Sequence, residues 1–220
     1  MPHVLNICFH GIGTPKRALE PGEDIYWVDV DRFESILDEV AQWPSIRISF
    51  DDSNASDIEI GLPALLKRNL RADFFVIAGR LGEPGSLSEA DVLQLREAGM
   101  KIGSHGMSHV SWRGMDAATR HAELVAARDR LASLLGTPVA EAACPRGQYD
   151  RGTLQALRHN GYSRVFTSDR RPANEQAWLQ PRYSVRSHDT AESMRAEVLA
   201  GPGVAAKLRG TAVGLVKRWR

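Results

Sequence analysis

Residues 46–52 read Ile-Arg-Ile-Ser-Phe-Asp-Asp, a short hydrophobic segment that runs directly into two adjacent carboxylates. The apolar part is typical of a strand, and in parallel α/β folds ligands bind at the carboxyl ends of strands. We therefore predict that Asp51 and Asp52 face one pocket, where one carboxylate could bind a cation while the other takes up a proton. Taken alone, the pair is more typical of a turn, because aspartate is common in loops.

Strand-like and helix-like segments alternate on both sides of this stretch. Strands are predicted at 4–9, 46–50, 72–77, 101–103, 140–144 and 163–167, and helices at 31–42, 62–69, 88–98, 117–135 and 151–159. Such alternation favours a parallel α/β architecture. No repeat or linker interrupts the 220 residues, so we expect one domain over residues 1–203 and a separate tail at 204–220.

The composition indicates a globular protein. Hydrophobic residues make up 43% of the chain and charged residues 25%, a balance that allows a buried core. The 28 lysines and arginines nearly cancel the 27 aspartates and glutamates, which argues against a nucleic-acid partner. Cys8 and Cys144 are too few for a disulfide framework, although a single bridge between them stays open, and they favour a reducing compartment.

The two ends of the chain bear on location. The first fifteen residues lack a basic leader, and no apolar run approaches the roughly 18 residues that a spanning helix needs, so we predict a cytoplasmic protein. Residues 204–220 are predicted to form a basic helix. This helix could rest on the anionic inner face of the membrane or on a protein partner, although a solvated surface is the commoner role of such segments.

Two histidines four residues apart follow another predicted strand. They are His105 and His109, in the sequence Ile-Gly-Ser-His-Gly-Met-Ser-His of residues 102–109. Imidazoles at this spacing can converge on one metal ion, although an isolated pair is more often incidental. Combined with an aspartate at the end of a neighbouring strand, they form a set of two histidines and one carboxylate that leaves coordination positions open. An open metal site indicates catalysis.

Two further segments carry candidate functional residues. Residues 144–150, Cys-Pro-Arg-Gly-Gln-Tyr-Asp, form a predicted turn after a strand, and such a turn can direct a backbone N–H of Arg146 toward a developing oxyanion. By itself the pattern indicates only a turn. Arg182 follows an apolar run and could orient a carboxylate, but from its neighbours alone a surface arginine is the simpler interpretation.

Together, these segments resemble the motifs of the polysaccharide deacetylase family, carbohydrate esterase family four. The resemblance extends over about residues 4–185. The family's Thr/Ser-Phe-Asp-Asp-Gly motif corresponds to residues 49–53, its His-Ser/Thr-x-x-His motif to residues 105–109, and its Ala-Thr-Phe-Phe-Val strand to residues 72–76. The fold that this resemblance implies is a distorted, incomplete (β/α) barrel.

The resemblance also implies the roles of the central residues. Asp51 would be the catalytic base, and Asp52, His105 and His109 would bind a divalent metal. Zinc is the metal expected first, with cobalt, nickel, manganese and iron as alternatives.

Three residues around this centre receive roles by the same resemblance. The backbone N–H of Arg146 would bind the oxyanion, and Arg182 would steady the base. The family's general-acid histidine usually lies in a late Leu-x-His motif, which His188 matches poorly. One branch, which resembles bacterial poly-N-acetylglucosamine deacetylases, has a permuted barrel and carries this histidine on the first strand in a Tyr/Phe-His context, which Phe9-His10 fits here. We therefore assign His10 as the general acid.

Some positions depart from the family pattern. Ser53 stands at a usual glycine, Asn54 at a frequent tyrosine and Arg146 at an aromatic residue, so we expect an unusual pocket shape and specificity. The base and all three predicted metal ligands are nevertheless present, which favours an active enzyme over a decayed one.

The function expected from the resemblance is metal-dependent removal of an N-acetyl group from a sugar. A cytoplasmic enzyme would meet a nucleotide-linked or lipid-linked intermediate of surface polysaccharide synthesis, such as O-antigen, capsule or exopolysaccharide. Two alternatives stay open: a catalytically silent sugar-binding homologue, and a deacylase of another N-acyl or O-acetyl carbohydrate.

Overall fold

The computed structural model describes residues 3–199. A parallel sheet forms its centre, in the order β10-β8-β7-β6-β5-β4-β1-β11. The strands are β1 (His3–Phe9), β4 (Ile46–Phe50), β5 (Ala72–Val76), β6 (Lys101–Ser104), β7 (Glu141–Ala143), β8 (Arg164–Thr167), β10 (Leu179–Pro181) and β11 (Tyr183–Ser184). A short strand, β9 (Ala173–Asn174), pairs antiparallel with β1, and β2 (Gly11–Ile12) pairs with β3 (Trp27–Val28).

The sheet nearly closes into a barrel at one point. Its two outermost strands, β10 and β11, are parts of one continuous segment in which only Arg182 separates them. Leu179 to Pro181 pair with β8, whereas Tyr183 and Ser184 pair with β1 at the other end of the sheet. This segment therefore links the two ends of the sheet, and Arg182 lies at the link.

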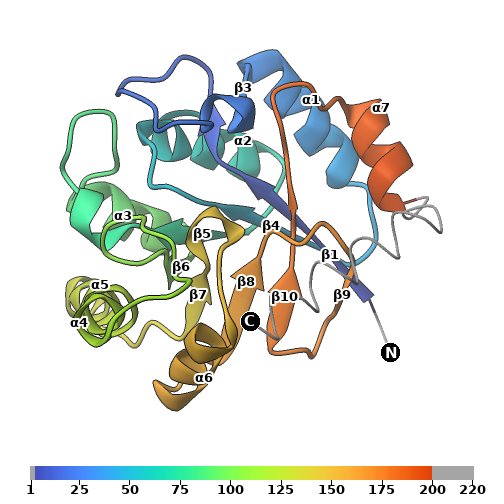
Figure 1. Cartoon of the computed structure of the whole chain (residues 1–220). Coiled ribbons are helices and arrows are strands. Elements are labelled where there is room, and N and C mark those ends of the chain that lie inside the picture. Colours follow the sequence, from blue (N-terminus) through green and yellow to red (C-terminus); the bar gives the residue numbers. More distant parts are fainter. Residues whose placement is uncertain (1–2, 200–220) are drawn as a thin grey trace.

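Helices surround the sheet (Figure 1), with α1 packed on α7 on one side and α3, α4 and α5 on the opposite side. Their bounds are α1 (Val30–Val40), α2 (Leu62–Lys67), α3 (Glu89–Glu97), α4 (Ala117–His121), α5 (Ala127–Leu135), α6 (Arg151–His159) and α7 (Ala191–Met194). Within residues 3–199, no helix combines the length and the apolar character needed to cross a membrane.

Local sequence explains where these helices begin and what they bury. Asp29 caps α1 by accepting a hydrogen bond from the Arg32 N–H, and Ser88 forms a capping box with Asp91 at the start of α3. On α1, the residues at helical spacing point into the core and are fully buried. They are Phe33, Ile36, Leu37 and Val40.

Alternation along the strands decides which residues face the barrel interior. The rings of Phe9 and Phe50 pack on Phe33 of α1, with centroid distances of 5.0 Å and 6.2 Å, so these two side chains face the helices. Their sequence neighbours consequently point the other way, into the barrel. These inward residues are Cys8, His10, Ser49 and Asp51.

The structure confirms the predicted fold class and most predicted elements. Residues 46–50 and 151–159 form the expected strand and helix, and most other ends differ by one or two residues. The helix predicted at 117–135 is continuous but contains a π-helical turn at Ala122–Ala126. The strands β10 and β11 were not predicted, because each is only two or three residues long and Pro181 argues against a central strand. The helix predicted at 204–220 lies outside the described residues.

A buried carboxyl group lies at the end of the barrel interior opposite Asp51. Asp73 of β5 has Arg47 as its nearest cation, at 4.0 Å, and its Oδ2 has no hydrogen-bond partner among the described residues. Burial and the nearby Glu141 carboxylate raise the pKa of Asp73 from its ordinary 3.8 to about 6. Asp73 therefore stays protonated to a higher pH in the folded protein than in the unfolded chain. As the pH rises from about 4 to about 7, its ionisation increasingly destabilises the folded state.

We predict that Asp73→Asn raises the free energy of unfolding by about 1–3 kcal/mol at pH 8, because it removes the poorly compensated charge while keeping the shape. The gain should be much smaller at pH 4.5, where the folded protein holds Asp73 protonated. Urea unfolding at both pH values measures this. Asp129→Asn on the exposed face of α5 is the control and should shift stability by less than about 0.5 kcal/mol at either pH. An equal gain at both pH values would contradict the assignment.

Candidate active site

Three side chains converge at the carboxyl end of the barrel. Asp52 follows β4, His105 follows β6, and His109 lies on the loop four residues further on. The Oδ1 atom of Asp52 lies 3.2 Å from Nε2 of His109 and 3.4 Å from Nε2 of His105. One ligand atom from each residue lies within 4.8 Å of the others, and all three side chains are buried. The predicted metal-binding residues are therefore brought together.

A left-handed turn directly after β4 produces this arrangement. Asp52 and Ser53 have φ values of +75° and +59°, a conformation that residues other than glycine adopt only when their surroundings enforce it. The hydroxyl oxygen of Ser53 accepts a hydrogen bond of 2.8 Å from the Ile77 N–H, and its carbonyl accepts one of 2.9 Å from the Leu87 N–H. Ser53, at a position that is usually glycine in the family, thus helps to hold the turn that aims Asp52.

Both imidazoles have a hydrogen-bond partner on the side that faces away from Asp52. The Nδ1 atom of His105 lies 2.9 Å from the carbonyl oxygen of Ala143, and Nδ1 of His109 lies 2.9 Å from a carboxylate oxygen of Glu20. With Nδ1–H donating to these oxygens, the lone pair of each Nε2 points toward Asp52, as metal-binding histidines require.

The Asp52 carboxylate also fits a metal ion. Its Oδ1 is buried without a hydrogen bond of good geometry among the described residues, although it lies close to both Nε2 atoms. Burial alone would raise the pKa of Asp52, but the two imidazoles hold that pKa well below its usual range. An ionised, incompletely paired carboxylate facing two imidazole nitrogens is a donor set that suits a divalent cation.

A carboxylate that the sequence analysis missed shapes the loop between the two histidines. Glu123, on the π-helical turn, is buried and accepts hydrogen bonds of 3.0 Å from the N–H groups of Met107 and Ser108, and one of 3.2 Å from the indole N–H of Trp112. Gly106 allows this close approach, because it has φ +82° and a Cβ there would lie 2.1 Å from Glu123. No local sequence pattern marks Glu123, which resembles any other helical glutamate.

Asp51 forms a fully buried ion pair with Arg182. The two guanidinium nitrogens donate to its two carboxylate oxygens at 2.7 Å and 2.6 Å, and a further bond of 3.1 Å reaches the Ser49 hydroxyl. The exposed fraction of Arg182 is 0%, and its guanidinium lies 5.2 Å and 5.8 Å from the ring centroids of Phe75 and Phe166. The simpler interpretation of Arg182 as a surface arginine is therefore wrong.

This pair controls the ionisation of Asp51. Burial alone would raise the pKa of Asp51, but the charge and the hydrogen bonds of Arg182 lower it below the ordinary value. In return, Asp51 raises the pKa of Arg182 despite the burial of the guanidinium. Asp51 is thus an ionised carboxylate beside the predicted metal-binding residues, in the state that a proton acceptor needs.

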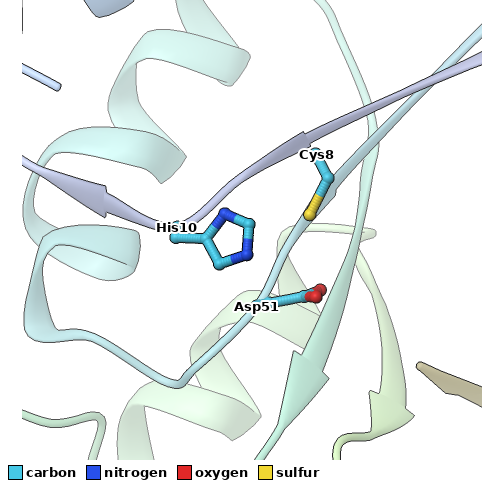
Figure 2. A group of neighbouring side chains, drawn as sticks. All are labelled: Cys8, His10 and Asp51. Carbon is cyan, nitrogen blue, oxygen red and sulfur yellow. The ribbon is translucent and has the colours of Figure 1, made fainter. Parts of the chain in front are cut away.

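His10 follows β1, and its side chain lies close to Asp51 (Figure 2). The side chains of Cys8, His10 and Asp51 point into one space, with a nitrogen, a sulfur and an oxygen atom all within 4.8 Å of one another. The ring of His10 also packs on that of Tyr26, with centroids 4.8 Å apart. Burial lowers the pKa of His10, although the carboxylates of Asp52 and Asp51 oppose this effect.

The Cys8, His10 and Asp51 group is a poor metal site in spite of its spacing. Both oxygens of Asp51 already bind Arg182, and burial raises the pKa of the Cys8 thiol well above its usual range, so that the metal-binding thiolate is disfavoured. Cys8 and Cys144 are both buried, and no disulfide joins them.

The remaining predicted residues take different positions. Arg146 has φ +55°, in the turn after β7, and its half-exposed side chain donates to Glu20 at 2.7 Å. His188 is exposed, with its nearest carboxylate at Asp189, and it does not line the cavity described next.

A cavity of about 280 Å³ lies above these groups. Six of the predicted site residues line it, and Arg182 lies behind Asp51 rather than on its wall. The six are His10, Asp51, Asp52, His105, His109 and Arg146. The loop before β3 contributes part of the wall, including Glu20 and Tyr26, which the sequence analysis did not single out.

Comparison with known proteins identifies the family. The sequence model of the polysaccharide deacetylase family matches residues 40–165, more than half of the chain, and the chain belongs to this family. It is 23% identical over 141 residues to YxkH of Bacillus subtilis (strain 168), whose assignment as a polysaccharide deacetylase is itself provisional. That match covers 64% of the chain but only 50% of YxkH, so the chain spans half the length of this relative.

Solved structures share the fold. The deacetylase PplD of Streptococcus pyogenes, in complex with acetate, superposes with a TM-score of 0.75 and 19% identity, over 88% of this chain and 96% of that one. IcaB from Ammonifex degensii gives a TM-score of 0.71 and 20% identity, over 88% of this chain and 96% of IcaB. These likenesses confirm the distorted, incomplete (β/α) barrel.

The buried ion pair makes a prediction about stability. We predict that Arg182→Ala lowers the free energy of unfolding by about 3–5 kcal/mol, because it leaves the Asp51 carboxylate buried without its main counter-charge. Adding Asp51→Asn to this variant should recover part of the loss, since no uncompensated charge then remains. Urea unfolding of the two single variants and the double variant measures the coupling. Arg146→Ala, at a half-exposed arginine, should cost less than about 1 kcal/mol. Additive effects of the two buried substitutions would contradict the prediction.

Proposed function

We propose that the protein is a metal-dependent deacetylase that hydrolyses the N-acetyl group of a sugar. The observation that carries the proposal is the convergence of Asp52, His105 and His109 beside a separate, ionised Asp51. Two imidazole nitrogens and one carboxylate oxygen can hold a metal while leaving coordination positions open for reactants. Asp51 is bound by Arg182 and is not one of the proposed ligands, so it is available as a base.

We propose zinc as the ion, with cobalt, nickel, manganese and iron as alternatives, because this donor set suits all of them. When bound, such an ion lowers the pKa of water and polarises a carbonyl oxygen. The second hydrogen bonds of His105 and His109 keep the two rings oriented for this role.

The surrounding residues provide the proton transfers and the stabilisation of charge. Asp51, kept ionised by Arg182, accepts the proton of the attacking water. His10, which lines the same cavity as Asp51, donates its own proton to the departing amine. The backbone N–H of Arg146, in the left-handed turn at the cavity wall, binds the oxyanion, a contact worth about 3 kcal/mol in other hydrolases.

The cavity supports a compact substrate. At about 280 Å³ it is slightly smaller than the usual range of ligand pockets, roughly 300–1,000 Å³, which favours one sugar unit over a long stretch of polymer. We therefore propose a nucleotide-linked or lipid-linked intermediate of surface polysaccharide synthesis, acted on in the cytoplasm or at the inner face of the membrane. A panel of N-acetylated mono- and oligosaccharides, with O-acetyl and other N-acyl sugars, tests this choice.

The role of Asp51 makes a sharp prediction. Asp51→Asn should lower the rate of acetate release by about 10²–10⁴-fold while keeping the metal, because it removes the proton acceptor but none of the proposed ligands. Acetate release and metal content are measured on the same samples. Asp73→Asn, which changes a buried aspartate at the other end of the barrel, should keep both. Normal turnover by Asp51→Asn would refute its role as base, and metal-loaded wild-type protein that releases no acetate from any substrate would indicate a silent homologue.

The ligand assignment is tested separately. His109→Ala should lose the metal during dialysis, because only two of the three proposed ligands remain, and elemental analysis of the purified protein measures the loss. His188→Ala removes an exposed histidine and should leave the metal content at the wild-type value. A fully loaded His109→Ala variant would contradict the proposed centre.

A further inference from the structure

Glu20 occupies an unusual position for a residue outside every motif described above. It lies on the loop of residues 13–23 between β2 and the short helix Asp24–Tyr26, far from His109 in the sequence. Its carboxylate nevertheless contacts Nδ1 of His109, with distances of 2.9 Å from Oε2 and 3.1 Å from Oε1. Glu20 also lines the cavity, with a quarter of its side chain exposed.

The two histidines of the centre are held in different ways. His105 binds a backbone carbonyl, that of Ala143, which the sheet fixes in place. His109 lies on a loop with φ +56°, and its ring is oriented by a side chain from a distant loop. The position of that side chain therefore decides where Nε2 of His109 points.

Two arginines hold the Glu20 carboxylate. Arg80, which follows β5, donates to Oε1, and Arg146 donates to Oε2 at 2.7 Å. Arg80 also reaches the backbone carbonyl oxygen of Asp52, at 3.4 Å. Glu20 thus connects His109 to two arginines. One of them, Arg80, also contacts the backbone of Asp52, which is a second proposed metal-binding residue.

The loop that carries Glu20 has its own attachments. Arg17 binds both Glu23 and the side-chain oxygen of Asn54, and the Glu23 carboxylate accepts a hydrogen bond of 2.8 Å from the Glu20 N–H. Lys16 pairs with the exposed Glu59 at 2.7 Å. Asn54, one of the departures from the family pattern, therefore helps to place this loop over the centre.

We infer that Glu20 is a positioning residue for the metal centre, which accepts the Nδ1–H hydrogen bond of His109 and so directs Nε2 toward the ion. The inference rests on the proposed binding of a metal by Asp52, His105 and His109. Its consequence is that metal affinity depends on a segment near the start of the chain that contributes no ligand. Carboxylates that orient a metal-bound histidine typically change metal affinity by about 10–100-fold when they are lost.

The test compares Glu20→Gln with Glu59→Gln. Both variants remove one negative charge from the loop or its attachment, but Glu59 pairs with Lys16 and touches no proposed ligand. Glu20→Gln should weaken the binding of Zn²⁺, measured by competition with a chromophoric chelator, by about 10–100-fold, and Glu20→Ala by at least as much. Glu59→Gln should stay within about threefold of the wild-type protein, because an exposed ion pair contributes little.

A second readout reports on the His109 ring itself. In protein loaded with Co²⁺, the Nδ1–H proton of each metal-bound imidazole gives a strongly shifted NMR signal. The wild-type protein and Glu59→Gln should show two such signals that exchange slowly with water. In Glu20→Gln the His105 signal should persist, because its partner is a backbone carbonyl, whereas the His109 signal should broaden or vanish through faster exchange. Circular dichroism melting confirms that the variants are folded.

The outcomes separate this inference from the proposed function. Wild-type Zn²⁺ affinity and an unchanged pair of signals in Glu20→Gln would overturn the inference while leaving the metal centre standing, provided that His109→Ala still loses the ion. An equal loss of affinity in Glu59→Gln would also overturn it, because general charge or loop attachment would then explain the effect. Absence of metal binding by the wild-type protein would overturn both the inference and the proposed centre.

Discussion

The buried ion pair between Asp51 and Arg182 is the interaction on which the site depends most. Arg182 lies at the point where one segment leaves β8 and joins β1, so the residue that links the two ends of the sheet also delivers the counter-charge. A charge removed from water is costly unless it is paired, and here each partner satisfies the other in a bidentate geometry. The same contact fixes the orientation of Asp51 and keeps it ionised. The segment that nearly closes the barrel therefore also holds the proposed base in place.

Backbone strain is concentrated around this centre. Asp52, Ser53, His109 and Arg146 all have positive φ values, and each lies where a strand or loop must change direction sharply to present a group to the cavity. Such conformations cost free energy and persist only where surrounding contacts enforce them. Hydrogen bonds to Ser53 and from the loop to Glu123 are the contacts that do so here. The sheet thus supports a small set of strained turns that carry the proposed site residues.

Acidic residues outside the motifs hold the site together. Glu123 fixes the loop between the two histidines, and Glu20 contacts the second histidine from a different part of the chain. Neither residue could be found from sequence patterns, because each works through a partner that is distant in the sequence and brought near only by folding. Tyr26, whose ring packs on His10, likewise could not be found from sequence patterns. The departures from the family pattern also make tertiary contacts: Ser53 accepts from the Ile77 N–H, Asn54 binds Arg17, and Arg146 binds Glu20.

The sequence by itself determined the alternation of strands and helices, the family, and the identity of the residues that the barrel gathers at one end. Those features depend on local periodicity and on short motifs, which are readable without coordinates. Tertiary structure decided that Arg182 is buried rather than exposed, that short strands on either side of it nearly close the barrel, that Glu20 contacts His109, and that Glu123 binds the loop between the two histidines. These features depend on contacts between residues far apart in the sequence, such as Asp51 and Arg182, which are 131 positions apart, and such contacts form only when the whole chain folds.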